Sequence, residues 1–184
     1  MSYLRTFLPW IVFAVLPSGS WQWAALAALV VAVAVIVQQI RAGVGLDALI
    51  IEVGSAVFFA VLAVIAFANP DSGVHDYSAA LSAGTLAVIA GVSLAIGKPF
   101  TLGIAKGSTP REVWGLKPFI QTNVIITAVW TAAFALTAVV LALVAHAGNA
   151  HSTTATVIQI AGFAVPMIFT VRYVAHVQAK AGVR

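Results

Sequence analysis

The chain has 184 residues, of which 62% are hydrophobic and 8% are charged. Soluble domains contain roughly 45–50% apolar and about 25% charged residues, so this composition excludes an ordinary soluble protein. The net charge is +4, but the basic residues fall in loops on one side of the predicted membrane, which does not indicate a nucleic-acid partner. The absence of cysteine excludes disulfides, thiolate metal sites and a cysteine nucleophile.

The apolar segments predict an all-α fold. A helix needs about 20 mostly apolar residues to cross a hydrocarbon core of about 30 Å. Residues 4–16 are apolar but reach only roughly 20 Å, so they either cross a thinned membrane or form a half-inserted or interfacial helix. Five longer segments predict transmembrane helices, at 21–40, 46–68, 77–96, 119–145 and 153–177. We therefore predict one transmembrane domain, an integral membrane bundle of five long helices plus a short N-terminal membrane-inserted helix.

The Lys and Arg residues predict the orientation of the bundle, because they favour the cytoplasmic side. The loops at 17–20, 69–76 and 146–152 contain none of the nine, whereas eight of the nine fall on the alternate side. Arg5 joins these eight if the short N-terminal segment crosses. We expect a multi-pass protein of the bacterial inner membrane, with its C-terminus and loop 97–118 in the cytoplasm.

Small and polar side chains on the helices indicate where they pack, because helices in lipid associate through close contact and polar bridges. Helix 77–96 is expected at the centre of the bundle, since it carries a stripe of small residues: Ala80, Gly84, Ala87, Gly91 and Ala95. Asn123, Thr127 and Thr131 form a polar stripe on helix 119–145, and Gln159 lies on the last helix. Thr127, Thr131 and Gln159 are candidates either for packing or for the lining of a substrate path.

Loop 97–118 is predicted to lie along the inner membrane surface as an amphipathic segment. Lys98-Pro99 predicts a short helix that ends near Lys106, and Thr109-Pro110-Arg111-Glu112 matches a capping box. The loop is either a membrane-hugging connector or a docking surface for a partner or an anionic lipid headgroup. The candidate docking residues are Lys98, Pro99, Lys106, Thr109, Arg111, Glu112 and Trp114.

Several short motifs resemble those of a family of bacterial polytopic membrane proteins. They are more distantly similar to the intracellular septation protein A family of inner-membrane-spanning proteins. The motifs of the first family are Gly97-Lys98-Pro99-Phe100-Thr101, Pro110, Val113-Trp114, Phe119, Asn123 and Trp130. Those shared with the septation family are Phe7-Leu8-Pro9, Lys98-Pro99, Val113-Trp114 and Asn123. The resemblance implies a role in the cell envelope or the division machinery, and it brings no catalytic site with it.

Glu52 is the only acid well inside a predicted span, about six residues or ~9 Å from the cytoplasmic end of its helix. A charge deep in the bilayer costs at least ~2.5–3.5 kcal/mol, so such an acid is a functional candidate. We expect a buried polar cluster of Glu52, Lys98, Asn123 and Arg172, in which Glu52 pairs with Lys98 or Arg172. This cluster is a structural ion pair or a site that handles protons or cations, unless Glu52 faces lipid.

Three histidines, His75, His146 and His151, fall in the outer loops near Asp71 and Asp76. Imidazoles and carboxylates ligate zinc and related metals. Since loop histidines are usually solvated and no helical spacing supports a site, we predict neither a metal nor a cofactor. No Ser-His-Asp set or His-Glu-x-x-His motif falls within the bilayer, so no enzyme activity is expected.

The function that these features favour is non-catalytic, that of an envelope or division scaffold or an accessory subunit of a larger membrane complex. The alternative is a small transporter or channel for protons, ions or a small solute, which uses Glu52 and the polar stripe of helix 119–145. The expected partners are membrane lipids and other membrane protein subunits or further copies of the chain.

Overall fold

The computed structural model describes residues 2–16, 18–45 and 48–180, and their regular elements are all helical. This confirms the all-α bundle. Five helices are long and apolar enough to cross a membrane: α2 (Trp21–Arg41), α3 (Ile50–Ala68), α4 (Val74–Ala95), α6 (Lys117–His146) and α7 (Thr153–Lys180). The short elements are α1 (Ser2–Val15), η1 (Ser18–Ser20), α5 (Phe100–Lys106) and η3 (Arg111–Val113).

The long helices follow the predicted segments closely, with one shift that matters for the site. Helix α3 begins at Ile50, whereas the sequence predicts a start at residue 46, and residues 46–47 lie outside the described ranges. The chain before Ile50 instead packs against α5, where a Cβ atom on Gly103 would lie 2.8 Å from the carbonyl oxygen of Ala48. Glu52 therefore lies in the first turn of α3 rather than well inside the helix.

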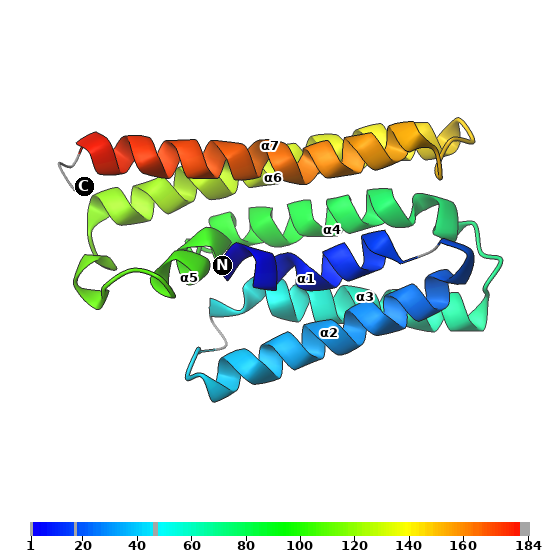
Figure 1. Cartoon of the computed structure of the whole chain (residues 1–184), viewed down its shortest axis with the longest axis horizontal. Helices are drawn as coiled ribbons and strands as arrows, with labels where there is room; N and C mark the ends of the chain where they lie inside the picture. The colour runs from blue at the N-terminus through cyan, green and yellow to red at the C-terminus, as the bar shows by residue number, and fades with distance from the viewer. Residues whose placement is uncertain (1, 17, 46–47, 181–184) are drawn as a thin grey trace.

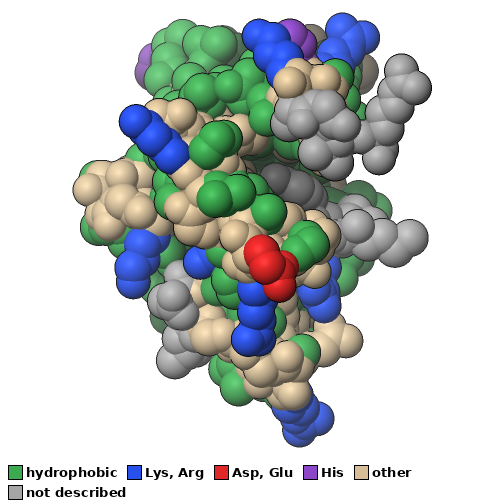
Figure 2. All heavy atoms as spheres, turned by 90° about the vertical axis from the view of Figure 1, so that its left-hand side faces the viewer, with side chains coloured by type: hydrophobic (Ala, Val, Ile, Leu, Met, Phe, Trp, Pro, Cys, Tyr) green, Lys and Arg blue, Asp and Glu red, His purple; other side chains and the backbone are tan. Residues whose placement is uncertain are grey.

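Successive long helices run in opposite directions, so the connections gather at two ends of the bundle (Figure 1). We call one of them the basic end, and Figure 2 shows Lys and Arg side chains spread over it. Its described basic residues are Arg5, Arg41, Lys98, Lys106, Arg111, Lys117 and Lys180. Arg172 precedes Lys180 on α7 and lies further from this end. We call the other the histidine end, because His75 in the first turn of α4, His146 at the end of α6 and His151 before α7 lie there.

Helix α1 buries one face in the bundle and leaves Leu8, Ile11 and Val15 exposed on the other. It runs parallel to α3, since Thr6 bonds to Glu52 and Trp10 bonds to Ser55 one turn further along. The ring of Phe7 stacks on Trp130 of α6, with their centroids 5.0 Å apart. Only 2% of Phe7 and 4% of Trp10 is exposed, so this face of the short helix belongs to the core of the bundle.

Helix α4 is central, as its small residues predict, because it packs on α3, α5 and most extensively on α6 (Figure 1). A Cβ atom on Gly84 would lie 3.7 Å from Ala138, and one on Gly91 would lie 3.6 Å from Thr131. Helix α7 packs mainly on α6, at a point where Gly162 approaches Thr137. Small side chains thus bring the helix backbones close together, as expected for a bundle in lipid.

Candidate functional site

Glu52 is buried near the basic end, where three helices meet. Only 4% of the residue is exposed. Its Oε1 atom accepts hydrogen bonds from the hydroxyl of Thr6 on α1, at 2.8 Å, and from the side-chain amide of Gln39 on α2, at 3.0 Å. Both donors are neutral groups. The unpaired backbone N–H groups in the first turn of α3 also favour a negative charge at this position. We call Glu52, Thr6 and Gln39 the Glu52 cluster.

The Glu52 cluster lines a cavity of about 490 Å³ at the basic end, bounded by α1, α2, α3, α5 and the loop after α5. Three basic side chains, Arg5, Lys106 and Arg111, line the same cavity, and so does Trp114. Its size lies within the roughly 300–1,000 Å³ that is typical of small-molecule sites. A cavity with three cations on its walls and one buried carboxylate attracts small anions.

Aromatic side chains pack together one to two turns further along α3 from Glu52. The indole N–H of Trp10 donates to Ser55 Oγ at 2.7 Å, and Ser55 in turn donates to the Ile51 carbonyl oxygen. The Trp10 ring packs on Phe58 and Phe59, with centroids 5.1 and 4.8 Å away. We call Trp10, Phe58 and Phe59 the aromatic layer.

A second polar cavity, of about 230 Å³, opens at the histidine end and is lined by His75, Asp76, His151 and Gln159. Gln159 also lines a small cavity of about 20 Å³ between α1, α4, α6 and α7, which Trp10 and Ser82 border. The Ser82 hydroxyl is buried and has no hydrogen-bond partner within the described ranges. Polar groups thus reach from the histidine end to the aromatic layer.

The predicted cluster of Glu52, Lys98, Asn123 and Arg172 does not form. Lys98 and Arg172 are exposed, and neither is paired with Glu52. Asn123 is buried and donates to the Phe119 carbonyl oxygen of its own helix at 2.9 Å. The reason is the placement of α5, which packs on the chain before α3 through Gly103 and on α6 through Thr101, and so keeps the two polar sites apart.

The polar stripe of α6 packs against the neighbouring helices α5 and α4. The Thr101 hydroxyl donates to the Asn123 carbonyl oxygen, so in its 2.8 Å contact with Thr127 the Thr127 hydroxyl is the donor. Thr131 donates to the Thr127 carbonyl oxygen at 2.8 Å. Gln159 lies apart from these residues, at the cavities of α7. The stripe and Gln159 therefore do not line one path, and the polar groups that do line cavities follow α1 instead.

The loop after α5 folds back on itself. Pro99 is the N-cap of α5, and Pro118 lies in the first turn of α6, close to the predicted positions. The predicted capping box is wrong, because the Thr109 hydroxyl donates to the Ala105 carbonyl oxygen at the end of α5. Trp114 donates to the Thr109 carbonyl oxygen at 2.9 Å.

Trp114 also lies next to two cations of the loop. The Lys106 ammonium is 5.3 Å from the centre of the indole ring, and the Arg111 guanidinium is 5.7 Å from it. Both distances are within the range of cation–π attraction. Glu112 and Lys98 are exposed. Of the candidate docking residues, Lys106, Thr109 and Arg111 therefore gather around Trp114 at the basic end, whereas Pro99 is buried.

Sequence reasoning missed Thr6, Gln39 and Ser55, which contact Glu52 or its neighbouring turn. A sequence pattern points to Thr6 alone, since Thr6, Trp10 and Phe13 are spaced by four and three residues and fall on one face of the short first helix. That face packs on α3 in the structure, where Phe13 meets Phe59 with ring centroids 5.5 Å apart.

Comparison of the chain with protein-family models, with curated proteins and with solved structures finds no match. The fold and its composition define the class, that of a multi-pass helical membrane protein. Its distinguishing features are a buried carboxylate beside a basic cavity and a second polar cavity at the opposite end.

Proposed function

We propose that this protein is a small transporter that moves a small anionic solute together with protons, and that Glu52 is its proton-binding group. The observation that carries the proposal is the position of Glu52, buried beside a cavity whose walls hold Arg5, Lys106 and Arg111. A carboxylate inside a bundle that binds only neutral donors is free to exchange a proton, whereas one in a fixed ion pair is not.

The charges in the cavity explain why transport of the anion and transport of the proton are coupled. The three cations attract an anion into the cavity, where an ionised Glu52 repels it. Protonation of Glu52 removes that repulsion, so the bound anion and the bound proton each raise the affinity for the other.

In this proposal the two cavities are the two entrances to the transport route. One opens at the basic end and one at the histidine end, and the aromatic layer around Trp10 separates them. Transporters bind their substrates near the middle of the membrane, with access from one side at a time. In this proposal the route follows α1, and the polar stripe of α6 serves to pack α5. The basic end faces the cytoplasm of a bacterial cell, in accord with the positive-inside rule.

The test uses the purified chain in liposomes that contain a pH-sensitive dye. Inward gradients of phosphate, sulfate or succinate are applied in turn, with the membrane potential clamped, and acidification of the interior is recorded. We expect at least one of these anions to drive proton entry in the wild type. Glu52→Gln keeps a hydrogen-bond acceptor for Thr6 and Gln39 and loses the ionisable group, so its proton entry falls to the level of empty liposomes.

Glu112→Gln is the matched control, because Glu112 is an exposed acid of the loop at the same end. This variant should retain the wild-type rate. If none of the three anions drives proton entry through the folded wild type, or if Glu52→Gln transports protons as fast as the wild type does, the proposal is wrong.

A second candidate is the scaffold or accessory subunit, which the surface around Trp114 favours. An internally bonded loop that carries a half-buried indole next to two cations suits a partner surface. The resemblance to the septation protein A family agrees with this role. Mild-detergent extraction followed by sizing tests it, since a subunit migrates with a larger assembly, and Trp114→Ala should release it while Glu52→Gln should not.

A further inference from the structure

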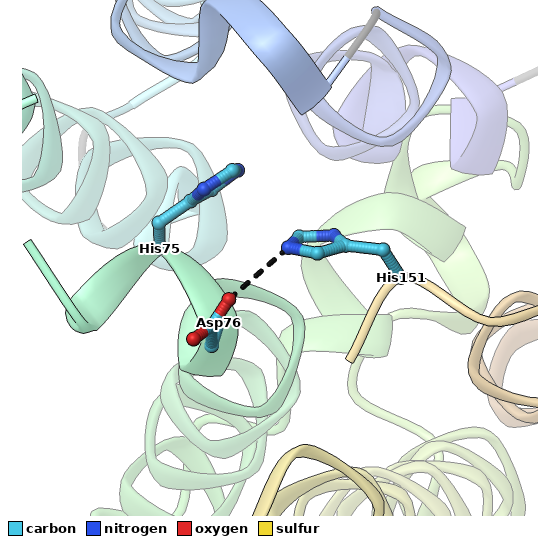
Figure 3. A group of neighbouring side chains, drawn as sticks. All are labelled: His75, Asp76 and His151. Carbon is cyan, nitrogen blue, oxygen red and sulfur yellow. Dashed lines mark hydrogen bonds and ion pairs between the residues drawn. The ribbon is translucent and has the colours of Figure 1, made fainter. Parts of the chain in front are cut away.

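Three potential metal ligands meet at the histidine end, from two segments that are far apart in the sequence. His75 and Asp76 lie in the first turn of α4, and His151 lies in the connection before α7 (Figure 3). One ligand atom from each residue lies within 4.8 Å of the other two. His151 Nε2 is 3.2 Å from Asp76 Oδ1, and the two imidazole rings have centroids 4.7 Å apart.

One of these three residues, His75, is oriented by the packed core. The His75 ring stacks on Trp21 of α2, with centroids 5.1 Å apart and an angle of 18° between the planes. Trp21 is itself buried, and its indole N–H donates to the Pro70 carbonyl oxygen at 2.8 Å. The backbone N–H of His75 donates to the Ser72 carbonyl oxygen at 2.9 Å. His75 is thus oriented by a packed indole, while Asp76 and His151 remain about half exposed.

We propose that His75, Asp76 and His151 bind a divalent first-row transition metal of the zinc type. Two imidazoles and one carboxylate are a donor set that zinc accepts, with a fourth position left open. A tetrahedral site with bonds of about 2.0–2.1 Å separates its ligand atoms by about 3.3 Å, so the present atoms need to approach by at most about 1.5 Å. Side-chain rotation of the half-exposed His151 and Asp76 supplies such a movement.

The donor atoms also decide which ions the site rejects. Magnesium and calcium prefer oxygen ligands, and two of the three donors here are nitrogens. Copper(I) prefers thiolate and thioether sulfur, which this group lacks. His75, Asp76 and His151 line the cavity of about 230 Å³ at the histidine end, so an ion bound there would have room for water or a small ligand. This site is at the opposite end from Glu52, and it does not depend on the transport proposal.

The test is a calorimetric titration of the purified full-length chain in detergent with Zn²⁺ alone. We expect one saturable Zn²⁺ site per chain in the wild type. His151→Ala and Asp76→Asn each remove one ligand and should weaken binding at least about tenfold. His146→Ala is the matched control, because His146 is exposed at the same end but lies outside the group. It should bind Zn²⁺ as the wild type does.

A second measurement covers the case in which a ligand variant fails to fold. The visible absorption bands of Co²⁺ added to the wild type report the geometry of its binding site, because they depend on how nitrogen and oxygen donors surround the ion. Zn²⁺ should displace the Co²⁺ and remove these bands. Wild-type protein that takes up no saturable Zn²⁺ below about 100 µM contradicts the proposal. Equal affinities in the wild type, His151→Ala and Asp76→Asn contradict it as well.

Discussion

Thr6 is a small side chain with two structural roles, because its hydroxyl satisfies Glu52 and its backbone belongs to the core helix α1. Thr6→Val keeps the shape of the side chain and removes the donor. We expect it to lower the free energy of unfolding by about 0.5–1.5 kcal/mol, since Glu52 then loses one of its two hydrogen bonds. Denaturant titration of the protein in detergent measures this change.

Thr6→Ser is the control for that experiment, because it keeps the hydroxyl and loses only a methyl group. It should be clearly more stable than Thr6→Val. If Thr6→Ser and Thr6→Val unfold at the same denaturant concentration, the hydrogen bond to Glu52 contributes nothing to stability.

Phe7 lies among aromatic rings of three other helices. It stacks on Trp130 and meets Phe100, Phe134 and Phe163 edge-on. Phe7→Ala should lower the free energy of unfolding by about 3–5 kcal/mol, because it leaves a cavity in a close-packed core. Leu8→Ala next to it should cost much less, since 37% of Leu8 is exposed at the surface of the bundle. Thermal unfolding of the two variants in the same detergent gives the comparison, and similar melting temperatures would place α1 outside the core.

At the level of elements, α5 holds the basic end together because it contacts both the chain before α3 and the start of α6. Gly103→Ala places a Cβ atom 2.8 Å from the Ala48 carbonyl oxygen, which belongs to the backbone and cannot rotate away. We expect a loss of about 1–3 kcal/mol in unfolding free energy and a lower melting temperature. Gly115→Ala should be harmless, since nothing lies within 4 Å of a Cβ atom there.

The contact between α5 and α6 can be measured as a coupling. Thr101 and Thr127 share a buried hydrogen bond of 2.8 Å, and neither side chain is exposed. A double-mutant cycle with Thr101→Val and Thr127→Val should give an interaction of about 0.6 kcal/mol, the average for such bonds between membrane helices. Strictly additive losses in unfolding free energy would mean that the two hydroxyl groups do not stabilise each other.

For the whole molecule, the proposed orientation is open to a direct test because the chain contains no cysteine. Asn149→Cys puts a single thiol at the histidine end, and Ser108→Cys puts one at the basic end, and both positions are exposed. A maleimide that cannot cross membranes should label Asn149→Cys in intact cells and Ser108→Cys only after permeabilisation. The reverse pattern would show that the basic end faces outward.

Composition predicted the helices well, because the length and apolarity that a membrane requires are local properties of the sequence. The burial of α1 was not predictable in this way, since an apolar helix of 14 residues has the same composition on an interface and in a core. The partners of Glu52 also depend on the rotation of each helix about its own axis and on the start of α3 at Ile50. The hydrophobic periodicity of the sequence specifies neither of these. His75 and His151 converge only through the packing of α4, α6 and α7.

The separation of charge along the bundle has an electrical consequence. The described basic residues lie toward one end, whereas Asp71 and Asp76 lie at the other, so the molecule carries a dipole along its long axis. A resting voltage that is negative on the basic side acts on each translocated charge with about 2.3 kcal/mol per 100 mV. With the basic end in the cytoplasm, the orientation proposed above, the voltage of an energised cell therefore opposes inversion of the inserted bundle, and this resistance disappears when the membrane is depolarised.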